Sequence, residues 1–383
     1  MERVYNFGAG PSMFPLAVLK EVQKELLDYE GSGMSVLEIS HRSALYEKIN
    51  DEAQADIKKL LGMDDSWVVM FMGGGATLQF SMIPMNFLKP GKVGAYAITS
   101  TFSEKAIAEA KKVGDAVEVF TSKPTGLDRV PQPEELVLPK DCAYLHITAN
   151  NTAEGTEYHK YPDTGEVPLI ADMSSDILSR PVPVDKFSLI YNGAQKNIGP
   201  AGVTVVMAKK DFVTGMDPNL PIMMNYETFS GHDSVYNTPP VFGVYMVGLM
   251  AKWLLAQGGL AAMEKRNKEK AKLVYGVLDS HPEFYKGHAQ PESRSLMNVT
   301  FNLPTPELEK KFVAEGAEHG LVSLKGHKSI GGIRASIYNA MPLDGCEALA
   351  AYMERFWKKN KGLITENWGI RNLRQNLKTE KRY

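Results

Sequence analysis

The chain has 383 residues, of which 44% are hydrophobic, and its 43 basic and 45 acidic side chains give a formal net charge of −2. A chain of this length exceeds one typical hydrophobic core, so two domains are expected, and the balanced charge argues against a protein that binds nucleic acid or a membrane surface. The 2 cysteines imply no disulfide framework. Because the sequence also lacks an apolar leader and any apolar run near the roughly 18 residues of a transmembrane helix, a cytoplasmic location is expected.

Strand and helix patterns alternate through the first two-thirds of the chain, which is typical of a mostly parallel sheet covered by helices. We predict strands at residues 68–71, 93–98, 116–120, 143–147, 167–171, 187–191 and 203–207. Helical patterns separate several of these runs, for example the one from Ser103 to Lys112. The sequence therefore predicts an α/β fold.

A glycine-rich turn, Gly73-Gly74-Gly75-Ala76, joins the first predicted strand to the start of a helix. Glycines let backbone N–H groups converge, and a helix N-terminus adds the positive end of its dipole, so a phosphate is the expected ligand. The motif has neither the dinucleotide spacing G-x-G-x-x-G nor the Lys-Ser/Thr ending of the nucleotide-binding loop. This favours a phosphate that is not part of a nucleotide, and the alternative is a tight turn without a ligand.

An acid and a lysine follow two later predicted strands. Asp172 comes directly after the run 167–171, and Lys196 follows the run 187–191. In an open α/β sheet, ligands bind beyond the carboxyl ends of the strands, so both side chains are expected at that edge. A pyridoxal phosphate (PLP) enzyme needs such a pair, because the amine forms a Schiff base with the cofactor aldehyde and the carboxylate keeps the pyridinium nitrogen protonated. Each residue alone is also typical of a solvated loop or a turn.

The last third of the chain contains a second, smaller unit. Helical patterns are predicted at 241–257 and 259–278, and they are followed by strand 296–302, helix 306–318, strand 332–337 and helix 344–358. Strands and helices alternate there too, so we expect a smaller α/β domain.

The predicted domain organisation has three parts. Residues 1–15 form an N-terminal segment that packs with the small domain, residues 16–262 form the large PLP-binding domain, and residues 263–383 form the small C-terminal domain. The tail from Glu366 to Tyr383 is predicted as a surface helix or a frayed end.

Several ordered sequence blocks resemble the phosphoserine aminotransferase family, which lies within the class V aminotransferases of PLP fold type I. The blocks are Glu38–Ser43 (EISHRS), Gly73–Phe80, Ala171–Pro181 (ADMSSDILSRP), Tyr191–Gly202 (YNGAQKNIGPAG), Tyr236–Pro240 (YNTPP) and Gly331–Pro342 (GGIRASIYNAMP). The resemblance extends over nearly the whole chain, from Asn6 to about Arg355. It implies a large domain with a mostly parallel seven-stranded sheet, a smaller C-terminal α/β domain, and pyridoxal 5'-phosphate as the cofactor.

The resemblance implies that Lys196 carries the cofactor, and that its freed amine then moves the proton from the substrate Cα. It implies that Asp172 pairs with the pyridinium nitrogen. Further implied cofactor contacts are Gly75 and Ala76 at the phosphate, Gln195 beside the lysine, Thr152 near the ring hydroxyl, Phe102 on the ring, and Asn237 and Thr238 from a neighbouring subunit. The last two imply a homodimer with shared active sites. No metal is expected.

The implied substrates are L-glutamate and 3-phosphohydroxypyruvate, whose shared α-carboxylate suits a bidentate arginine. Arg334 has the position for this role. The distal group is a phosphate in one half-reaction and a γ-carboxylate in the other, and its candidate partners are His41, Arg42, His327 and Lys328. The implied products are O-phospho-L-serine and 2-oxoglutarate, in serine biosynthesis. The sequence leaves open whether a longer phosphorylated precursor of vitamin B6 is also a substrate.

Three positions depart from the family pattern. Phe102 stands where many members have a tryptophan on the ring, Thr77 where many have an arginine, and Lys328 where the family has an arginine after the histidine. A phenyl ring still stacks, with less area, and a lysine keeps the charge but loses the planar fork. These departures concern the strength of phosphate binding more than the type of reaction.

Two alternatives from other classes stay open. One is a different fold type I enzyme, such as an alanine–glyoxylate-type transaminase or a cysteine desulfurase, although neither Cys142 nor Cys346 suits a mobile catalytic cysteine. The other is a non-catalytic PLP-binding protein, against which the Lys196–Asp172 pair argues.

Overall fold

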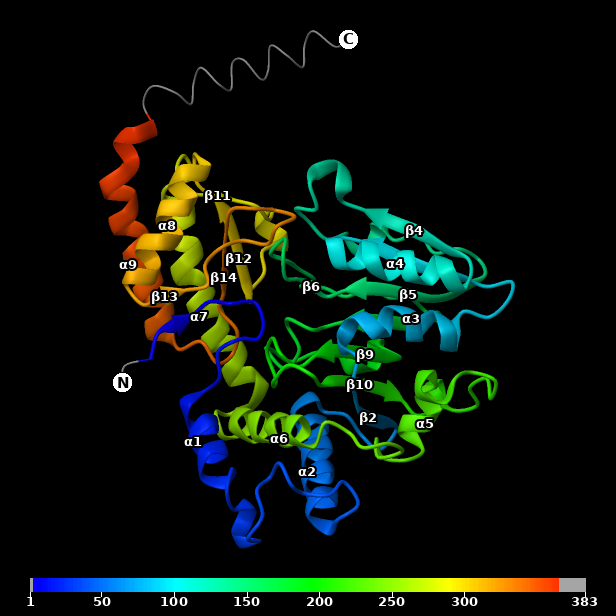
Figure 1. Cartoon of the computed structure of the whole chain (residues 1–383). Helices are drawn as coiled ribbons and strands as arrows, with labels where there is room; N and C mark the ends of the chain where they lie inside the picture. Colours follow the sequence, from blue (N-terminus) through cyan, green and yellow to red (C-terminus); the bar gives the residue numbers. More distant parts are fainter. Residues whose placement is uncertain (1–2, 365–383) are drawn as a thin grey trace.

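The computed structural model describes residues 3–364, so the tail from Glu366 to Tyr383 lies outside the described residues. Figure 1 shows two packed units, a large twisted sheet with helices on both faces and a group of helices and short strands beside it. The N-terminal segment, drawn in blue, runs along the orange and red elements of the second unit. Segments from both ends of the described chain therefore meet in one place.

The large sheet has seven strands within residues 3–364, in the order β2-β10-β9-β8-β5-β3-β4. Their bounds are β2 (Trp67–Met72), β3 (Val93–Ile98), β4 (Ala116–Thr121), β5 (Cys142–Thr148), β8 (Leu169–Asp172), β9 (Leu189–Gly193) and β10 (Thr204–Lys209). β10 runs antiparallel to both of its neighbours, and the other pairs are parallel. β2 is therefore parallel to β9, and the carboxyl ends of β2, β9, β8 and β5 lie at one edge of the sheet.

Side chains alternate between the two faces of the sheet. In β2, Val69 and Phe71 join one hydrophobic cluster, while Met70 and Met72 join another on the opposite face. The first face is covered by α1 (Leu16–Glu25), α2 (Ala44–Leu61) and α6 (Val241–Ala256), and the second by α3 (Gly75–Phe87), α4 (Thr101–Val113) and α5 (Tyr226–Ser230). This double cover explains why most of the strands are buried along their whole length.

The second unit packs helices against short strands. Its elements are α7 (Gly259–Ser280), β11 (Lys286–Gly287), β12 (Asn298–Asn302), α8 (Pro306–Glu318), β14 (Ile333–Ser336) and α9 (Leu343–Asn360). β11, β12 and β14 form an antiparallel sheet, and beside it β1 (Tyr5–Asn6) pairs in parallel with β13 (Leu321–Val322). A separate hydrophobic cluster fills this unit and includes the fully buried Phe7. The short pair β6 (Asn150–Asn151) and β7 (Thr156–Glu157) lies between the two units.

The α/β fold with a mostly parallel seven-stranded sheet confirms the prediction from the sequence. The predicted strand 93–98 and helix 306–318 have the same bounds as β3 and α8. The predicted strands 167–171 and 187–191 begin two residues later, because the N–H groups of Val167 and Phe187 bind the carbonyls of Thr164 and Val184 in turns. The domain boundaries after residues 15 and 262 stay predictions.

No single helix within residues 3–364 is long and apolar enough to cross a membrane. Helices α6 and α7 reach that length and composition only as a pair, and they meet at a bend of 83°.

Candidate active site

Asp172 is the last residue of β8, at the edge where β5 and β9 also end. It is 5% exposed. Ser174 fixes its carboxylate, since the N–H and the hydroxyl of Ser174 both donate to Asp172 Oδ1, at 2.9 and 2.6 Å. Gly193 N–H, at the end of β9, donates in turn to Ser174 Oγ at 3.1 Å. Two neighbouring strands thus set the orientation of one buried acid.

Lys196 lies in the turn that follows β9. Its Nζ donates to Thr152 Oγ1 at 2.6 Å and lies 5.1 Å from the ring centre of Phe102, at the start of α4. Burial lowers the pKa of the Lys196 ammonium, the charge of Asp172 raises it, and the charge of Arg334 lowers it. The structure therefore brings the predicted lysine, acid and arginine into one electrostatic environment, with the predicted threonine and aromatic ring in contact with the amine.

The N-terminal segment supports the turn that carries Lys196. Ser12 N–H donates to Gln195 O at 3.0 Å, and Ser12 Oγ donates to Lys196 O. Glycine is favoured at position 10, where φ is +154° and a Cβ would lie within 3.3 Å of the Lys196 side chain and of the Gln195 carbonyl oxygen. The side chain of Gln195 lies against Gly193, where a Cβ would be 2.8 Å from Gln195 Oε1. Gln195, which is predicted to contact the phosphate, thus lies next to the lysine in a turn that the N-terminal segment supports.

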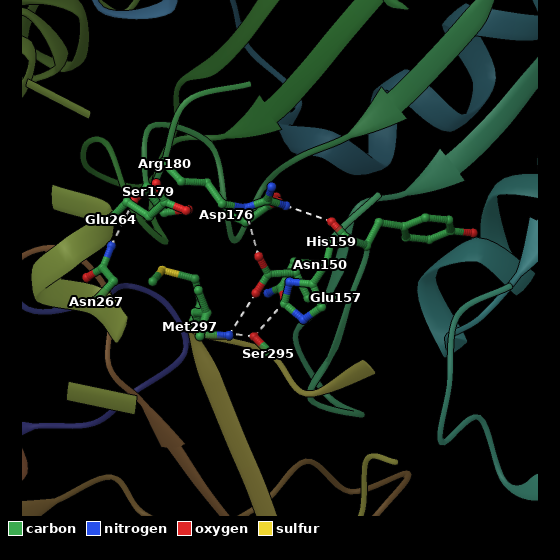
Figure 2. A network of polar contacts seen from close by, with 12 residues as sticks. Asn150, Glu157, His159, Asp176, Ser179, Arg180, Glu264, Asn267, Ser295 and Met297 are labelled. Carbon is green, nitrogen blue, oxygen red and sulfur yellow. Dashed lines mark hydrogen bonds and ion pairs between the residues drawn. The ribbon is translucent and has the colours of Figure 1, made fainter. Parts of the chain in front are cut away.

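Thr152 belongs to a buried chain of hydrogen bonds that reaches the second unit. Its hydroxyl donates to Ser175 Oγ at 2.9 Å, and Ser175 Oγ donates to Asn150 O at 2.9 Å. Asn150 in turn accepts from Ser295 Oγ at 2.6 Å and donates to Asn298 Oδ1 at 2.8 Å. Figure 2 shows Asn150 and Ser295 at the junction of the two units. The residue that holds the Lys196 amine is therefore held by both units.

Figure 2 also shows Arg180 between two acids. Arg180 Nε donates to Glu157 Oε1 at 2.9 Å, and its second amino group lies 3.7 Å from Asp176 Oδ2. Glu157 Oε2 accepts from Leu296 N–H at 2.7 Å. Removing one member of a buried ion pair costs about 3–5 kcal/mol, so Arg180 has a structural role at the junction and its charge is already neutralised.

The glycine turn lies between β2 and α3, at the same edge of the sheet as Asp172. Gly74 and Gly75 have φ of +84° and +67°, a backbone region that favours glycine. No side chain caps the N-terminus of α3, and a Cβ on Gly73 or Gly75 would meet no atom within 4 Å. The first N–H groups of α3, those of Gly75 and Ala76 among them, are thus left for an anion.

Arg334 lies on β14, beside Thr300 of β12. Its Nε is buried and has no hydrogen-bond partner in the part of the chain that the structure describes. Burial lowers the pKa of the guanidinium, while the charges of Tyr338 and Glu154 raise it. A buried donor without a partner is destabilising, so Arg334 is prepared for an anionic ligand close to Lys196.

Glu154 is a buried carboxylate that the sequence reasoning did not identify. Its Oε1 accepts from the N–H and the hydroxyl of Thr101, both at 3.0 Å, and its Oε2 has no partner among the described residues. Burial raises its pKa. Thr300 Oγ1 donates to Glu154 O at 2.8 Å. Glu154 therefore fixes the start of α4, which carries Phe102, against β12.

His327 and Lys328 lie in the loop before β14. The ring centre of His327 is 6.3 Å from that of Phe102, and His327 Nδ1 is 2.6 Å from Ser329 Oγ. Burial lowers the pKa of His327, and the charge of Arg334 lowers it further. Lys328 is exposed. The structure thus brings His327 to the predicted site and leaves Lys328 at its outer side.

The remaining predicted residues lie elsewhere on the chain. Arg42, Asn237 and Thr238 are exposed and His41 is half-buried. His41 and Arg42 precede α2, and Asn237 and Thr238 precede α6, two helices of the same sheet face. Within residues 3–364 of one chain, no hydrogen bond or ion pair connects these four residues to Lys196.

Ser174 is the residue near Asp172 that a closer sequence analysis would have found. A hydroxyl residue two positions after an aspartate often donates to its carboxylate, and the sequence Asp172-Met173-Ser174 has that pattern. Glu154 and Ser12 gave no comparable signal, because their partners are distant in the sequence. No group of three or more His, Cys, Asp or Glu side chains among the described residues could hold a metal ion.

The chemistry of these groups fits pyridoxal phosphate. Lys196 supplies an amine with a lowered pKa, Asp172 a fixed carboxylate, and the N-terminus of α3 free N–H groups for a phosphate. These three protein groups match the three reactive parts of the cofactor: the amine matches its aldehyde, the carboxylate its ring nitrogen, and the N–H groups its phosphate.

Comparison with known proteins agrees with this fit. Residues 4–349 match the family model for class-V aminotransferases. The chain is 50% identical to phosphoserine aminotransferase from Lysinibacillus sphaericus over 360 aligned residues. The alignment covers 94% of this chain and 99% of the relative. Phosphoserine aminotransferase from Bacillus circulans subsp. alkalophilus superposes with a TM-score of 0.93 at 48% identity, covering 94% of this chain and 100% of that one. PLP-bound phosphoserine aminotransferase from Trichomonas vaginalis superposes with a TM-score of 0.87 at 39% identity, covering 92% and 100%.

Proposed function

Since the chain belongs to the phosphoserine aminotransferases of the class-V aminotransferase family, we infer that it transfers the amino group of L-glutamate to 3-phosphohydroxypyruvate. The products are O-phospho-L-serine and 2-oxoglutarate, and the cofactor is pyridoxal phosphate. One observation carries the chemistry: the Lys196 amine and the fixed Asp172 carboxylate lie at one sheet edge, and the half-buried Arg334 acts on the same amine. This arrangement supplies a nucleophile, a partner for a ring nitrogen and a site for a carboxylate.

Pyridoxal phosphate supplies an aldehyde that takes up the amino group and a ring that accepts the electrons released at the substrate Cα. Asp172 is the residue that would pair with the ring nitrogen, because Ser174 holds its carboxylate at the end of β8. An ionised carboxylate favours the protonated form of a neighbouring nitrogen. Gly75 and Ala76 would hold the phosphate with N–H groups, and Phe102 would cover the ring.

Lys196 has two tasks in the proposed mechanism, as the nucleophile that holds the cofactor and as the base that moves the substrate proton. Burial lowers its pKa, which increases the fraction of neutral amine, and only the neutral amine attacks a carbonyl or accepts a proton. The contact of 2.6 Å with Thr152 Oγ1 fixes the position of the amine. The chain of hydrogen bonds behind Thr152 in turn fixes the hydroxyl that contacts the amine.

Arg334 would bind the α-carboxylate that both substrates share, since two N–H groups of a guanidinium match two carboxylate oxygens. The distal phosphate or γ-carboxylate would lie towards His327 and Lys328, on the loop before β14. Because the site binds a phosphate in one half-reaction and a γ-carboxylate in the other, its cations must accept either anion.

We further propose a homodimer with shared active sites, in which His41, Arg42, Asn237 and Thr238 serve the site of the partner subunit. The four residues lie at the exposed starts of α2 and α6, and none of them contacts Lys196 within the described part of one chain. A phosphate dianion needs more cations than Lys328 alone, so a second subunit that brings Arg42 would complete the site.

A cysteine desulfurase is the alternative that the structure argues against. Such an enzyme needs a reactive thiolate. Burial raises the pKa of Cys346 to about 12 and raises the pKa of Cys142 above its usual value. Neither thiol has the depressed pKa of a nucleophile.

A comparison of amino acceptors tests the function most directly. Glutamate-loaded enzyme is mixed with 3-phosphohydroxypyruvate, glyoxylate or pyruvate at equal concentration, and the rate of amino transfer is measured. We expect the phosphorylated acceptor to react at least about 100-fold faster per unit concentration, because a charged interaction is worth about 1.5–3 kcal/mol and the phosphate makes more than one. Equal rates with glyoxylate would indicate an alanine–glyoxylate-type transaminase.

Two narrower points remain part of the proposal. The enzyme would act in the cytoplasm, in serine biosynthesis. A longer phosphorylated hydroxy acid of vitamin B6 synthesis would fit the same pair of anion sites, and the acceptor comparison extends to it directly.

A further inference from the structure

Lys105 is a cation at the edge of the site that has no role in the mechanism above. It lies on α4, one turn after Phe102. Its Nζ lies 5.2 Å from the ring centre of Phe102, and the Nζ of Lys196 lies 5.1 Å from the same centre. The ring that would cover the cofactor is therefore in contact with two amines, the Lys196 amine and the Lys105 amine.

The ammonium of Lys105 has no counter-ion in the part of the chain that the structure describes. The two acids nearest to it along α4 are engaged with other lysines: Glu104 lies 3.3 Å from Lys123, and Glu109 lies 2.7 Å from Lys112. The Lys105 side chain is exposed. A positive charge is thus held over an aromatic face, where the cation–π contact orients it but leaves its three N–H donors free.

His327 connects Lys105 to the predicted residues for the distal anion. The ring of His327 lies 6.3 Å from that of Phe102. After burial and the charge of Arg334, the charge of Lys105 is the next cause that lowers the pKa of His327, ahead of that of Lys328. Lys105 and His327 therefore both lie beside the ring of Phe102, at 5.2 Å and 6.3 Å from its centre.

We propose that Lys105 binds the distal anion of the substrate, and that it favours the phosphate of 3-phosphohydroxypyruvate over the γ-carboxylate of glutamate. This proposal rests on the proposed function. A phosphate dianion has three acceptor oxygens and nearly twice the charge of a carboxylate. Lys328 meets one of these oxygens as a point charge without the planar fork of an arginine. A second ammonium, which α4 presents beside the ring of Phe102, supplies the additional donor that a dianion uses and a monoanion does not.

The test compares Lys105→Met, which keeps the apolar stem over Phe102 but removes the charge, with Lys105→Arg, which keeps the charge. Lys111→Met, an exposed lysine of the same helix, is the matched control. In holoenzyme we expect Lys105→Met to raise the KM for 3-phosphohydroxypyruvate about tenfold, to raise the KM for glutamate less, and to leave kcat near that of the parent. Lys105→Arg and Lys111→Met should both remain close to the parent.

A binding measurement separates recognition from catalysis. Calorimetry with 3-phosphoglycerate, which has the phosphate and the carboxylate but no keto group, should show about tenfold weaker binding to Lys105→Met, while binding of glycerate stays unchanged. Binding of 3-phosphoglycerate within twofold of the parent would overturn the proposal. An equal loss for glycerate, or a fall in kcat with every substrate, would also overturn it, since Lys105 would then act only through the position of Phe102. If the parent does not use 3-phosphohydroxypyruvate at all, it is the proposed function that fails.

Discussion

Two lysines whose pKa is lowered by burial show how hydrogen bonding decides what such an amine can be used for. Burial lowers the pKa of Lys270 to about 8. Its Nζ donates to the carbonyls of Ile337, Tyr338 and Met341, at 2.9, 2.7 and 3.1 Å. All three donors are used, so Lys270 ties α7 to the chain that follows β14. The Nζ of Lys196 donates to a single side-chain hydroxyl and keeps donors free for chemistry.

Lys196→Ala should therefore abolish both turnover and covalent attachment of the cofactor. Borohydride reduction of the parent, followed by peptide mass spectrometry, should place the cofactor on Lys196. Lys270 is the other lysine with a pKa lowered by nearly complete burial, and Lys270→Met should leave Lys196 as the labelled residue. Label on Lys270 or on any third lysine in the parent enzyme would contradict the assignment.

Asp172→Asn should leave the cofactor bound but reduce turnover by several orders of magnitude. The amide oxygen can still accept the two hydrogen bonds from Ser174, so the local structure is kept while the charge is lost. Loss of the partner of a buried cation costs about 3–5 kcal/mol, or roughly 10²–10⁴ in rate if the cost falls on the transition state. The measurement is kcat together with the cofactor content of the purified variant. Near-normal kcat at full cofactor content would show that another group pairs with the ring nitrogen.

Sequence reasoning at this scale was effective for residues whose role depends on local context. Asp172 and Lys196 follow recognisable strands, and the structure places both at the same edge. Glu154 was not identified, because its contact to Thr101 joins residues that are distant in the sequence. Lys105 was not identified either, although it follows Phe102 by one turn of α4, because no motif marks it. An acid or a lysine without a local motif looks like any other surface charge in the sequence.

At the scale of elements, the large sheet buries a row of polar aromatic groups on one face. His146 on β5 is almost fully buried; its Nε2 is 2.9 Å from Tyr191 OH on β9, and its ring stacks on that of Tyr96 on β3 at 5.0 Å. Burial lowers the pKa of His146 from 6.5 to about 3. The imidazole is therefore neutral in the folded protein near neutral pH.

This row predicts the direction of the pH dependence of stability. Above pH 6.5 His146 is neutral in both the folded and the unfolded chain, so its contribution to the free energy of unfolding is fully present there. Below pH 6.5 the unfolded chain gains a proton that the folded chain refuses until about pH 3, so the free energy of unfolding falls by about 1.4 kcal/mol per pH unit from this residue. Urea unfolding of His146→Gln, which keeps a hydrogen-bonding group but does not titrate, should show a slope smaller by one proton between pH 6.5 and about pH 4.5. Equal slopes for parent and variant would mean that His146 is protonated in the folded state.

The strands themselves were largely predictable, but their directions and the shortest pairs were not. The apolar run that forms β10 has the same pattern in either direction, so its antiparallel pairing with β2 and β9 was not visible in the sequence. The pairs β1–β13 and β6–β7 have two residues per strand, too few for any periodicity. Yet β6 adjoins Thr152 and contains Asn150, which contacts Ser295 and Asn298 of the second unit. The pair β1–β13 holds the N-terminal segment on the second unit.

At the scale of the whole molecule, the proposed homodimer makes Arg42 part of the partner subunit's site. If the sites are shared in a homodimer, Arg42→Ala should raise the KM for 3-phosphohydroxypyruvate and for glutamate, because both distal anions would lose the same cation. One buried charged pair suggests about 2–4 kcal/mol, a factor of roughly 30 to 1000. Arg355→Ala, an exposed arginine of α9, is the control and should leave both constants unchanged.

Mixed dimers distinguish a shared site from a local one. Arg42→Ala homodimers should have a low kcat/KM, and Lys196→Ala homodimers should be inactive. Heterodimers of the two should regain a KM near that of the parent at one of their two sites, where Lys196 of one subunit meets Arg42 of the other. Isolation of the heterodimer by two affinity tags and measurement of its kcat/KM for 3-phosphohydroxypyruvate test this directly. No recovery in the isolated heterodimer would mean that Arg42 serves its own subunit.

The N-terminal segment that supports the Lys196 turn also determines at which stage of synthesis the active site can form. Phe7 N–H donates to Val322 O at 3.0 Å, and Ser336 N–H donates to Phe7 O at 3.1 Å. Residues 5–12 leave the ribosome long before β13 and β14 are made, an interval of tens of seconds at about 5–20 residues per second. Until then Phe7 has no core to enter, and Ser12 is not anchored beside the lysine. The nascent chain can assemble its large sheet during translation, but we expect no catalysis until the second unit has folded and the N-terminal segment has packed against it.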